Sequence, residues 1–348
     1  MTGYRPWRLA DLDDVRPNGL RVASLFSGCG GSSLGYKLAG FTVAYANEFV
    51  PLAAQTYRAN STTPVDTADV RTVDAARIVE LAGGPVDVLD GSPPCATFSI
   101  AGNRTKDWGR VKAYSEGISQ RTDDLFDEYT RLVGELRPRA FVAENVAGFT
   151  AGMAVGYARR ILAALRAHGY RVEARVVDAQ WLGVPQTRRR TIILGVRDDV
   201  GRAPTFPTPY RWRVPLGDIV PDCRGQVTGD GFYGNDSQGA RRSPRLPSLT
   251  IGASTNSGSG KWPNSVVFAP FAADPETGYA TPPQERIRRF WPNESVRYMT
   301  LGEVRRVCSF PDDFTLLGKF AQRWERLGRA VPPLMMAAVA RPLAEVLS

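Results

Sequence analysis

The chain has 348 residues, a formal net charge of +9 and a single histidine. Its length allows a large buried core, and 43% hydrophobic and 23% charged residues exclude a disordered chain. One histidine, His168, leaves no room for a Ser/His/Asp triad or a histidine-rich metal site, so we expect no metal. The polar first twenty residues and the lack of a long apolar run predict a cytoplasmic protein without a secretory signal or membrane span.

The first two hundred residues alternate apolar runs with helical patterns. Strands are predicted at 21–26, 42–48, near 65–70, at 86–90 and 140–144, and near 171–178 and 191–197. Helices are predicted after the glycine-rich turn at 27–31 through Leu38, and at 51–59, 123–136 and 153–168. This alternation predicts an α/β, Rossmann-like fold with an open, mostly parallel sheet and helices on both faces. Ligands of such sheets bind at the carboxyl ends of the strands.

The composition changes beyond residue 198. Half of the 26 prolines fall between 201 and 300, and helical periodicity disappears there. We predict a smaller, loop-rich and β-rich domain over 198–296, which is basic. The larger domain then comprises 1–197 plus 297–348, with tail helices at 300–308 and 331–347.

The basic charge is carried mainly by arginine. Lysine occurs at five positions, and arginine supplies the other 39 basic residues. Because arginine binds phosphate and base edges in two-pronged fashion, nucleic acid is the first partner to consider. Arginine that merely replaces lysine as a solubilising residue would give the same composition, so charge alone does not decide between these interpretations.

The glycine-rich turn predicts a nucleotide site. Gly28, Gly30 and Gly31 follow a strand and precede a helix, which lets the backbone approach a ligand. Ser33 occupies the last position of a dinucleotide fingerprint and disfavours NAD. Glu48, about twenty residues on, can hold ribose hydroxyls, and Asp69 an adenine amino group. Together these residues outline an adenosine site without a clear pyrophosphate site.

Cysteine chemistry is the second signal. Cys29, Cys95, Cys223 and Cys308 form no C-x-x-C pair, and widely spaced cysteines are usually buried small hydrophobes. Cys95 differs, because it directly follows Pro-Pro beyond a strand end, where a nucleophile would be placed. Glu144 ends the next strand, so a carboxyl group and a thiol would meet above the adenosine site. That pair suits attack on a heterocycle with protonation of its ring nitrogen.

At this point the chain resembles the cytosine-C5 DNA methyltransferases. The resemblance spans nearly the whole chain, and its ordered set of motifs is far more specific than any single one. The motifs are Leu25-Phe-Ser-Gly-Cys-Gly-Gly31, Asn47-Glu48, Pro94-Cys95 with Phe98-Ser99, Asp124-Leu125-Phe126, Glu144-Asn145-Val146, Gln186-Thr-Arg188-Arg-Arg190, Arg297 through Glu303 to Phe310-Pro311, and Gly328-Arg-Ala-Val-Pro-Pro333.

The resemblance implies a covalent mechanism on a cytosine that is flipped out of duplex DNA. Cys95 would add to C6 and Glu144, followed by Asn145 in its motif, would hold a proton to N3. Arg188 would pair with the base O2 and a phosphate, with Arg190 in support. S-adenosyl-L-methionine would supply the methyl group for C5. The residues implied to bind this cofactor are Phe26, Gly28, Cys29, Gly30, Gly31, Glu48, Phe49, Asp69, Val70, Pro94, Leu125, Arg329 and Val331.

The resemblance also predicts where double-stranded DNA is contacted. A mobile loop over 99–124 and the small domain carry the candidates, although solvated loop charges would look the same. They are Arg104, Lys106, Arg110, Lys112, Tyr233, Arg241, Arg242, Arg245 and Lys261. Arg297, Glu303 and Arg305 fit a structural block between the domains. We expect a monomer, with a cognate restriction endonuclease as a further partner.

Two departures from the family pattern affect the expected function. Ala96 replaces the glutamine that usually follows Pro-Cys, which weakens one contact around the opened duplex. Arg329 replaces an asparagine close to the transferred methyl, where a guanidinium would face a sulfonium. Arginine binds carboxylate well, so carboxymethyl transfer from carboxy-S-adenosylmethionine is an alternative to methyl transfer, unless Arg329 turns to a local acid, the methionine carboxylate or solvent.

Other classes of function remain open at this stage. A transfer-RNA cytosine methyltransferase would share the core, although the long basic segment before Arg297 favours duplex DNA. An inactive DNA-binding regulator would not need Cys95, Glu144 and Arg188. An NAD-dependent enzyme is the weakest alternative, given Ser33.

Overall fold

A computed structural model of the chain describes most of its residues. They are 4–94, 111–113, 119–121, 124–151, 154–228, 240–253, 266–270, 273–276, 278 and 293–348, with the backbone alone for 111–113, 119–121, 228 and 240. The chain divides into two compact units. Unit 1 comprises Met1–Asp11, Ala179–Arg188 and Pro209–Pro332, and unit 2 comprises Leu12–Asp178, Arg189–Thr208 and Pro333–Ser348.

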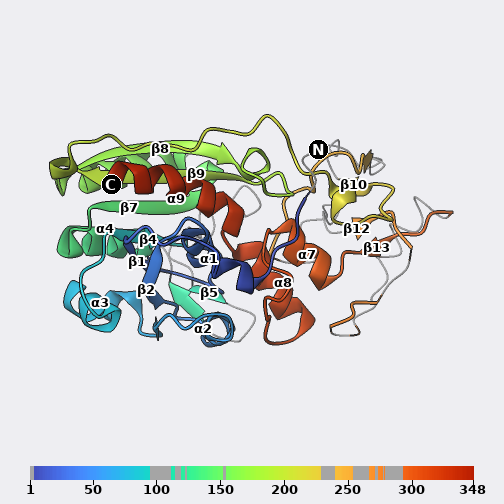
Figure 1. Cartoon of the computed structure of the whole chain (residues 1–348), viewed down its shortest axis with the longest axis horizontal. Helices are drawn as coiled ribbons and strands as arrows, with labels where there is room; N and C mark the ends of the chain where they lie inside the picture. The colour runs from blue at the N-terminus through green and yellow to red at the C-terminus, as the bar shows by residue number, and fades with distance from the viewer. Residues whose placement is uncertain are drawn as a thin grey trace. The chain divides into compact units, whose positions relative to one another are not determined.

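Unit 2 is built on a seven-stranded sheet with the order β3-β2-β1-β4-β7-β9-β8 (Figure 1). Its strands are β1 (Arg21–Leu25), β2 (Thr42–Asn47), β3 (Val65–Asp66), β4 (Val88–Gly91), β7 (Ala140–Val146), β8 (Tyr170–Asp178) and β9 (Arg189–Arg197). Neighbouring strands are parallel except that β9 runs antiparallel to both β7 and β8. The predicted mostly parallel α/β sheet is therefore confirmed.

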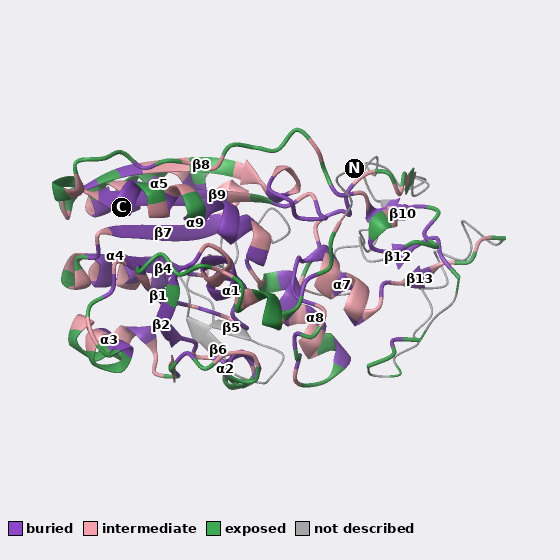
Figure 2. Ribbon diagram, viewed as in Figure 1, coloured by how far each residue is buried: buried purple, intermediate pink, exposed green. Residues whose placement is uncertain are grey.

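Helices cover both faces of this sheet. They are α1 (Gly31–Leu38), α2 (Pro51–Arg58), α3 (Ala75–Ala82), α4 (Leu125–Leu136), α5 (Val155–Ala167) and α9 (Pro333–Leu347). Side chains alternate along a strand, and Leu25 of β1 shares one core with Ile78 of α3, Tyr129 of α4 and Ile161 of α5. Ser24 points the other way, toward the face that α1 covers. Figure 2 shows β7 buried along its length, whereas the edge strand β8 is partly exposed.

The helix α9 packs closely on α1. An added Cβ at Gly35 would lie 2.5 Å from Cβ of Met336 and 2.6 Å from the carbonyl oxygen of Pro333. The C-terminal end of α9 is held by arginines, because Arg139 donates to the carbonyl of Leu347 and Arg202 to that of Glu345. These contacts place the last helix of the chain firmly in unit 2.

The described residues of unit 1 form a small antiparallel sheet with the order β11-β10-β12-β13 and two helices. Its elements are β10 (Gln226–Thr228), β11 (Ala240–Arg242), β12 (Val266–Val267), β13 (Arg297–Tyr298), α7 (Leu301–Val307) and α8 (Phe320–Arg329). Val227, Val266 and Phe268 form its core. Arg297 forms a two-pronged ion pair with Glu303, as expected of a structural block. That residues 198–296 form a separate target-recognition domain stays a prediction.

Short elements complete the described chain. A hairpin is formed by β5 (Val111–Ala113) and β6 (Ser119–Arg121). The 3-10 helices are η1 (Leu9–Leu12), η2 (Val70–Thr72), η3 (Ala147–Thr150), η5 (Ala179–Trp181), η6 (Asp198–Val200) and η7 (Leu216–Asp218).

One stretch meets the criteria for a membrane span, although the sequence analysis expected none. Phe320–Leu347 is long and apolar enough to cross a membrane by length and composition alone. However, 67% of its most apolar window is buried inside the protein, which is typical of core helices. The stretch consists of α8 and α9.

Candidate active site

A buried carboxylate and an arginine meet at the end of β7. Glu144 lies near the carboxyl end of β7, and Arg190 is the second residue of β9. The register pairs Arg190 with Val146 and Ile192 with Glu144, so both side chains lie on the same face of adjacent strands. The Nε of Arg190 is 2.8 Å from Oε1 of Glu144, and the two side chains are 16% and 11% exposed. A hydrogen-bonding carboxyl group is thus fixed at the ligand-binding edge of the sheet.

Asn145 connects this strand end to the segment that leads to Cys95. Its side-chain amide donates to the carbonyl of Pro93 at 3.1 Å, and its oxygen accepts from the backbone N–H of Val146 at 2.9 Å. The strands β4 and β7 are parallel, and Gly91 is paired with Ala143. The segment with Pro93 and Pro94 therefore leaves the sheet beside Glu144. Cys95 lies outside the described residues.

The glycine-rich turn is held by Glu48. This buried carboxylate, directly after β2, accepts from the backbone N–H of Gly28 at 2.7 Å and that of Val50 at 2.8 Å. The turn has left-handed backbone at Phe26 (φ 53°), Gly28 (φ 56°) and Gly30 (φ 98°). Phe26 adopts this conformation despite its side chain, and such strain is typical of functional turns. An added Cβ at Gly28 would meet no atom of the described residues within 4 Å.

The other predicted cofactor residues of unit 2 differ in exposure. Tyr57 of α2 packs on the turn, because an added Cβ at Gly30 would lie 3.0 Å from its ring. Cys29, Gly30, Gly31, Val70 and Leu125 are buried, whereas Phe26, Gly28, Phe49 and Pro94 are partly exposed.

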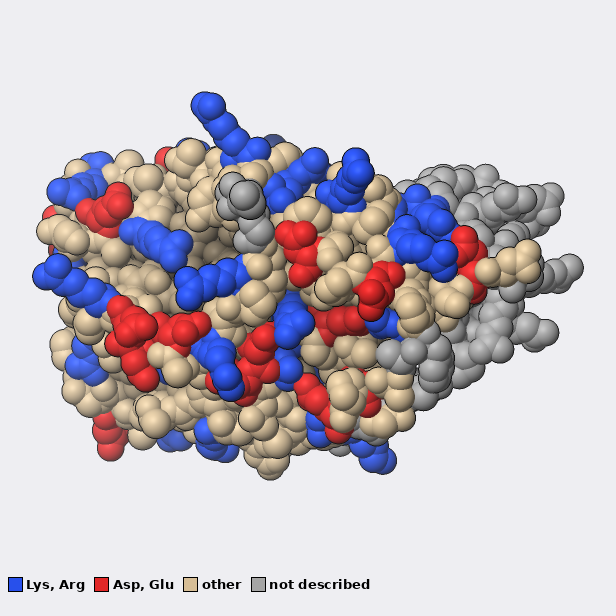
Figure 3. Space-filling model, turned by 45° about the vertical axis from the view of Figure 1, so that its right-hand side comes forward, with Lys and Arg blue, Asp and Glu red and all other residues tan. Residues whose placement is uncertain are grey.

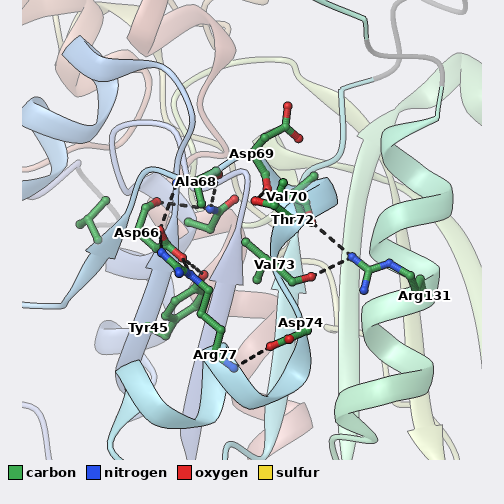
Figure 4. Close-up of polar contacts among 12 residues, drawn as sticks. Tyr45, Asp66, Ala68, Asp69, Val70, Thr72, Val73, Asp74, Arg77 and Arg131 are labelled. Atoms are coloured by element: carbon green, nitrogen blue, oxygen red, sulfur yellow. Dashed lines mark hydrogen bonds and ion pairs between the residues drawn. The ribbon is translucent and has the colours of Figure 1, made fainter.

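Asp69 lies just beyond β3, where the segment turns into η2 (Figure 4). Its carboxylate accepts from Arg71 at 3.0 Å, and Arg71 also pairs with Asp124 at 2.6 Å. Arg131 of α4 donates to the carbonyl of Val70, the first residue of η2, and to that of Val73, which follows η2. Asp69 is therefore held at the carboxyl edge of the sheet by an arginine that the sequence analysis did not single out.

Arg188 is buried among backbone carbonyls, and its predicted contact with the base stays a prediction. Its side chain is 2% exposed, and its guanidinium donates to the carbonyls of Ile251 at 3.3 Å, Gly328 at 3.1 Å and Ala330 at 2.9 Å. All of these residues belong to unit 1. The structure thus gives Arg188 a scaffolding position and pairs Arg190, the predicted supporting residue, with Glu144.

Arg329 ends α8 and pairs with an acid on the same helix. Its Nη2 lies 2.6 Å from Oε1 of Glu325, one helical turn earlier. The sequence analysis named a local acid as one destination for this side chain, and the ion pair realises it. Arg329 and Val331 belong to unit 1, whereas the other candidate cofactor residues belong to unit 2.

The described DNA candidates differ in how firmly they are held. Arg241 pairs with Glu294 and stacks 4.0 Å above the ring of Phe268. Arg242 donates to the carbonyl of Pro247, and Arg245 is exposed. Arg104, Lys106, Arg110, Tyr233 and Lys261 lie outside the described residues, and Lys112 is described by its backbone only. On the face drawn in Figure 3, acidic and basic side chains are interspersed.

Sequence reasoning missed an aromatic and arginine cluster in unit 1. Arg213 stacks 4.8 Å from the ring centroid of Trp181. Tyr210, 38% exposed, stacks on Trp212 with centroids 4.9 Å apart and donates its backbone N–H to Trp181. Arg211 and Arg213 are exposed and form no ion pair with any residue that the structure describes. The signal was present as Tyr-Arg-Trp-Arg in a segment without acidic residues.

The described part of the chain has no candidate metal site. No group of three or more His, Cys, Asp or Glu side chains is placed there to hold a metal ion.

Comparisons with known proteins identify the family. Residues 20–345 match the family described as C-5 cytosine-specific DNA methylase. The type II methyltransferase M1.HphI of Haemophilus parahaemolyticus is 29% identical over 332 residues, covering 92% of this chain and 86% of that protein. M.NgoPII of Neisseria gonorrhoeae is 27% identical and covers 95% of this chain and 97% of its own.

Solved structures show the same fold. A DNMT2 variant of Spodoptera frugiperda has a TM-score of 0.63 at 17% identity, covering 94% of this chain and 99% of that one. The methyltransferase EhMeth of Entamoeba histolytica has a TM-score of 0.64 at 16% identity, with the same coverage. Because the family match spans most of its length, the chain belongs to the C-5 cytosine-specific DNA methylase family.

Proposed function

We propose that this chain methylates C5 of a flipped-out cytosine in double-stranded DNA through a covalent adduct with Cys95. The family to which it belongs uses S-adenosyl-L-methionine. The observation that carries the proposal is the Glu144–Arg190 pair beside the Asn145–Pro93 hydrogen bond. These contacts support a site in which Glu144 holds a proton and the segment that leads to Cys95 lies at the same edge of the sheet.

The described residues of unit 2 fit the cofactor. Glu48 is anchored by two backbone N–H groups at the end of β2, where a carboxylate can hold ribose hydroxyls. Among the described residues, nothing would lie within 4 Å of a Cβ added at Gly28 of the turn. Asp69, whose carboxylate is paired with Arg71, would meet the adenine amino group. When bound, S-adenosylmethionine supplies an electrophilic methyl group.

The proposed chemistry uses the residues of this chain in a fixed order. The Cys95 thiolate forms a bond to C6 while the ring electrons move toward N3, where Glu144 holds a proton. C5 would then bond to the methyl group as the bond between that methyl and the sulfur of the cofactor breaks, which leaves S-adenosylhomocysteine. The C5 proton passes to solvent as the C5–C6 double bond re-forms, the C6–sulfur bond breaks to release the thiolate, and the proton at N3 returns to Glu144. Arg190, which orients Glu144, takes the contact with the base O2, and Arg188 holds the last motif in place.

The predicted recognition domain over 198–296 and the aromatic cluster supply DNA contacts in this proposal. Arg213 on Trp181, with Tyr210 on Trp212, presents arginine and flat aromatic surface together. Phosphates attract exposed arginines, and aromatic rings pack against sugars and bases. Arg241, Arg242 and Arg245 would contribute further contacts on β11 and the turn after it.

Arg329 allows a second candidate reaction, the transfer of a carboxymethyl group. A guanidinium at this position was expected to need a carboxylate partner, and Glu325 provides one within the protein. The ion pair gives Arg329 a carboxylate partner without a carboxylated cofactor, which supports methyl transfer in this proposal. Methyl transfer is the better supported reaction.

Nucleoside mass spectrometry tests these alternatives together. Duplex DNA and transfer RNA would each be incubated with the protein and with either S-adenosylmethionine or carboxy-S-adenosylmethionine. We expect 5-methylcytosine in DNA alone. Product in transfer RNA alone would identify an RNA enzyme, and 5-carboxymethylcytosine would identify a carboxymethyltransferase. DNA binding without any product would identify an inactive regulator.

The names of the relatives add a proposal about partners. Several are type II methyltransferases, so we propose that this protein acts with a cognate restriction endonuclease and protects its recognition sites. Protection of methylated DNA against digestion by candidate endonucleases checks this proposal.

A further inference from the structure

Asp90 is a buried acid in the centre of the sheet of unit 2. It is the third residue of β4, and 1% of its surface is exposed. Burying a carboxylate is costly unless it is well hydrogen-bonded. Among the described residues no arginine or lysine forms an ion pair with it, and its partners are hydroxyl groups. Burial raises the pKa of Asp90 to about 7, although hydrogen bonds from Ser32, Ser24 and Tyr36 oppose this rise.

The hydroxyl groups that bind Asp90 belong to the two elements that flank the predicted cofactor turn, β1 and α1. Oδ2 accepts from Ser24 of β1 at 2.9 Å and from Ser32 of α1 at 2.7 Å. The Oδ1 atom accepts from Tyr36, also of α1, at 3.4 Å. In the turn, Ser27 donates from its side chain to the carbonyl and hydroxyl oxygens of Ser24, and its own carbonyl accepts from the N–H of Gly30.

This network has a preferred direction for its protons. An ionised Asp90 only accepts, so Ser24 and Ser32 both donate to it and the oxygen of Ser24 can accept from Ser27. A protonated Asp90 must donate to one of these hydroxyls, which then has to turn its own proton away. The hydrogen bonds of Asp90 then lose the assistance of its negative charge, so protonation weakens the contacts that hold the residues on either side of the turn.

The same residue lies on the path to the catalytic loop. After Asp90, β4 ends at Gly91 and continues through two prolines into Cys95, and the first proline is fixed by Asn145. The strand that leads to the nucleophile is thus tied through one carboxylate to the turn at Phe26–Gly31.

We propose that Asp90 is a positioning residue whose ionised carboxylate holds the glycine-rich turn in its cofactor-binding geometry. The proposal rests on the function proposed above for that turn. It implies that cofactor affinity depends on a single proton in the core of the sheet.

The other titratable groups around Asp90 do not replace it in this role. Tyr36 of α1 and Tyr129 of α4 have pKa values raised well above 10 by burial and the nearby Asp90 carboxylate. Burial also raises the pKa of Tyr57 of α2 to about 12. These phenols stay neutral near pH 7. Glu144 of β7 is the remaining acid that acts on Asp90, and its charge contributes to the raised pKa of Asp90.

Binding of S-adenosylhomocysteine, followed by calorimetry over a range of pH, tests the proposal without turnover. For the wild type we expect the dissociation constant to rise as pH falls through about 7. Asp90→Asn keeps the shape but removes the charge, so its dissociation constant is expected to be independent of pH and about tenfold higher above neutrality. In steady-state kinetics the KM for the cofactor should rise while the KM for DNA is unchanged.

A matched control is the same Asp-to-Asn substitution at a second aspartate beside β4. Asp87 precedes β4 and accepts from the N–H of Arg21 outside the network, so Asp87→Asn should retain the pH dependence of the wild type. Ser32→Ala removes one donor and leaves Asp90 ionisable. Because the carboxylate loses a hydrogen bond, the midpoint of its binding curve should move to higher pH.

The outcomes separate the two proposals. A wild-type affinity that does not change with pH, or an Asp90→Asn variant with the wild-type pH dependence, overturns the role of Asp90. Should Asp90→Asn not fold, an unmoved midpoint in Ser32→Ala does the same. If S-adenosylhomocysteine binds with the expected pH dependence but no nucleic acid is methylated, the proposed function fails while the role of Asp90 stands. If it does not bind the wild type, both fail.

Discussion

At the scale of single residues, the two arginines of one short motif have different environments. Arg188 and Arg190 are two positions apart, yet one donates to three backbone carbonyls and the other pairs with Glu144. The motif spacing identifies both as important but does not say which faces the carboxylate. That choice depends on where β9 begins and on its register against β7, which arise from packing of the whole sheet.

Exchanging these arginines for alanine separates their roles. Arg190→Ala should lower kcat about a hundredfold with little change in stability, because it removes the group that orients Glu144. Arg188→Ala should lower the free energy of unfolding by about 2–4 kcal/mol, because buried carbonyls lose their donor. Single-turnover kinetics and urea unfolding measure the two effects. The assignment fails if Arg190→Ala retains full activity.

The raised pKa of Asp90 also predicts how the stability of the protein depends on pH. Its pKa is about 7 in the folded protein, against 3.8 for an unperturbed aspartate, so the folded state binds the extra proton between these values. The contribution of this residue to the free energy of unfolding therefore decreases as pH rises from 3.8 to about 7.

Asp90→Asn lacks this pH-dependent loss. Relative to the wild type, the variant should gain about 1–4 kcal/mol in unfolding free energy between mildly acidic and mildly alkaline pH. Urea unfolding of both proteins across that range measures the difference. A difference that stays constant with pH contradicts a raised pKa for Asp90.

At the scale of elements, the sequence predicted most of the sheet and its helices. The apolar strands β1, β2, β4, β7, β8 and β9 and the helices α1, α2, α4, α5 and α9 lie where periodicity placed them, within a few residues at their ends. The strand expected near 65–70 is only Val65–Asp66, because the chain turns at once so that Asp66 can accept from the N–H of Ala68 and pair with Arg77.

Two helices were missed although their signals were present. Asp74 caps α3 through the N–H of Arg77, and Gly83 ends it with φ 67°. Phe320, Trp324 and Leu327 recur at helical spacing along α8 and are buried. By contrast, the hydroxyl network of Asp90 joins β4 to β1 and α1, whose contacting residues lie 54 to 66 positions earlier in the sequence. No local pattern could have predicted it.

The helices α1 and α9 pack closely against each other at Gly35. Gly35→Ala would place a methyl group against Met336 and the backbone of Pro333, so we expect a loss of about 1–3 kcal/mol from overpacking. Gly156→Ala in α5 is the matched control, because nothing lies within 4 Å of the added carbon. It should be neutral or stabilising by up to about 1 kcal/mol. Equal effects of the two changes in urea unfolding contradict the close packing.

At the scale of the whole molecule, the net charge of +9 is not concentrated on the one face drawn in Figure 3. Many arginines are paired with acids, as Arg71, Arg160 and Arg306 are. We therefore expect DNA binding to depend on local clusters rather than on the average charge. The motif resemblance predicted DNA as the partner, whereas composition alone left the partner open, and we expect the contacts to come from exposed arginines that have no acid beside them among the described residues.

The aromatic cluster gives a test of this view. Arg213→Ala and Tyr210→Ala should weaken DNA binding at all sequences, and Arg213→Ala should reduce the salt dependence of the binding constant by about one ion. Arg175→Ala is the control, because Arg175 also stacks on an aromatic ring, that of Phe206, but lies in unit 2. Fluorescence anisotropy at several salt concentrations measures the effect. Equal salt slopes for Arg213→Ala and the wild type contradict a phosphate contact.

The most direct test of the whole account is to trap the proposed adduct. Duplex DNA that carries 5-fluorocytosine in its recognition sites cannot lose a proton from C5, so the enzyme should stay bound covalently after methyl transfer. With S-adenosylmethionine we expect a complex that survives denaturation, with the DNA attached to the peptide that contains Cys95. Cys95→Ala should form none, whereas Cys308→Ala, which changes a buried cysteine of unit 1, should form it normally. A wild-type protein that methylates cytosine without such a complex, or a complex that persists in Cys95→Ala, would contradict the account.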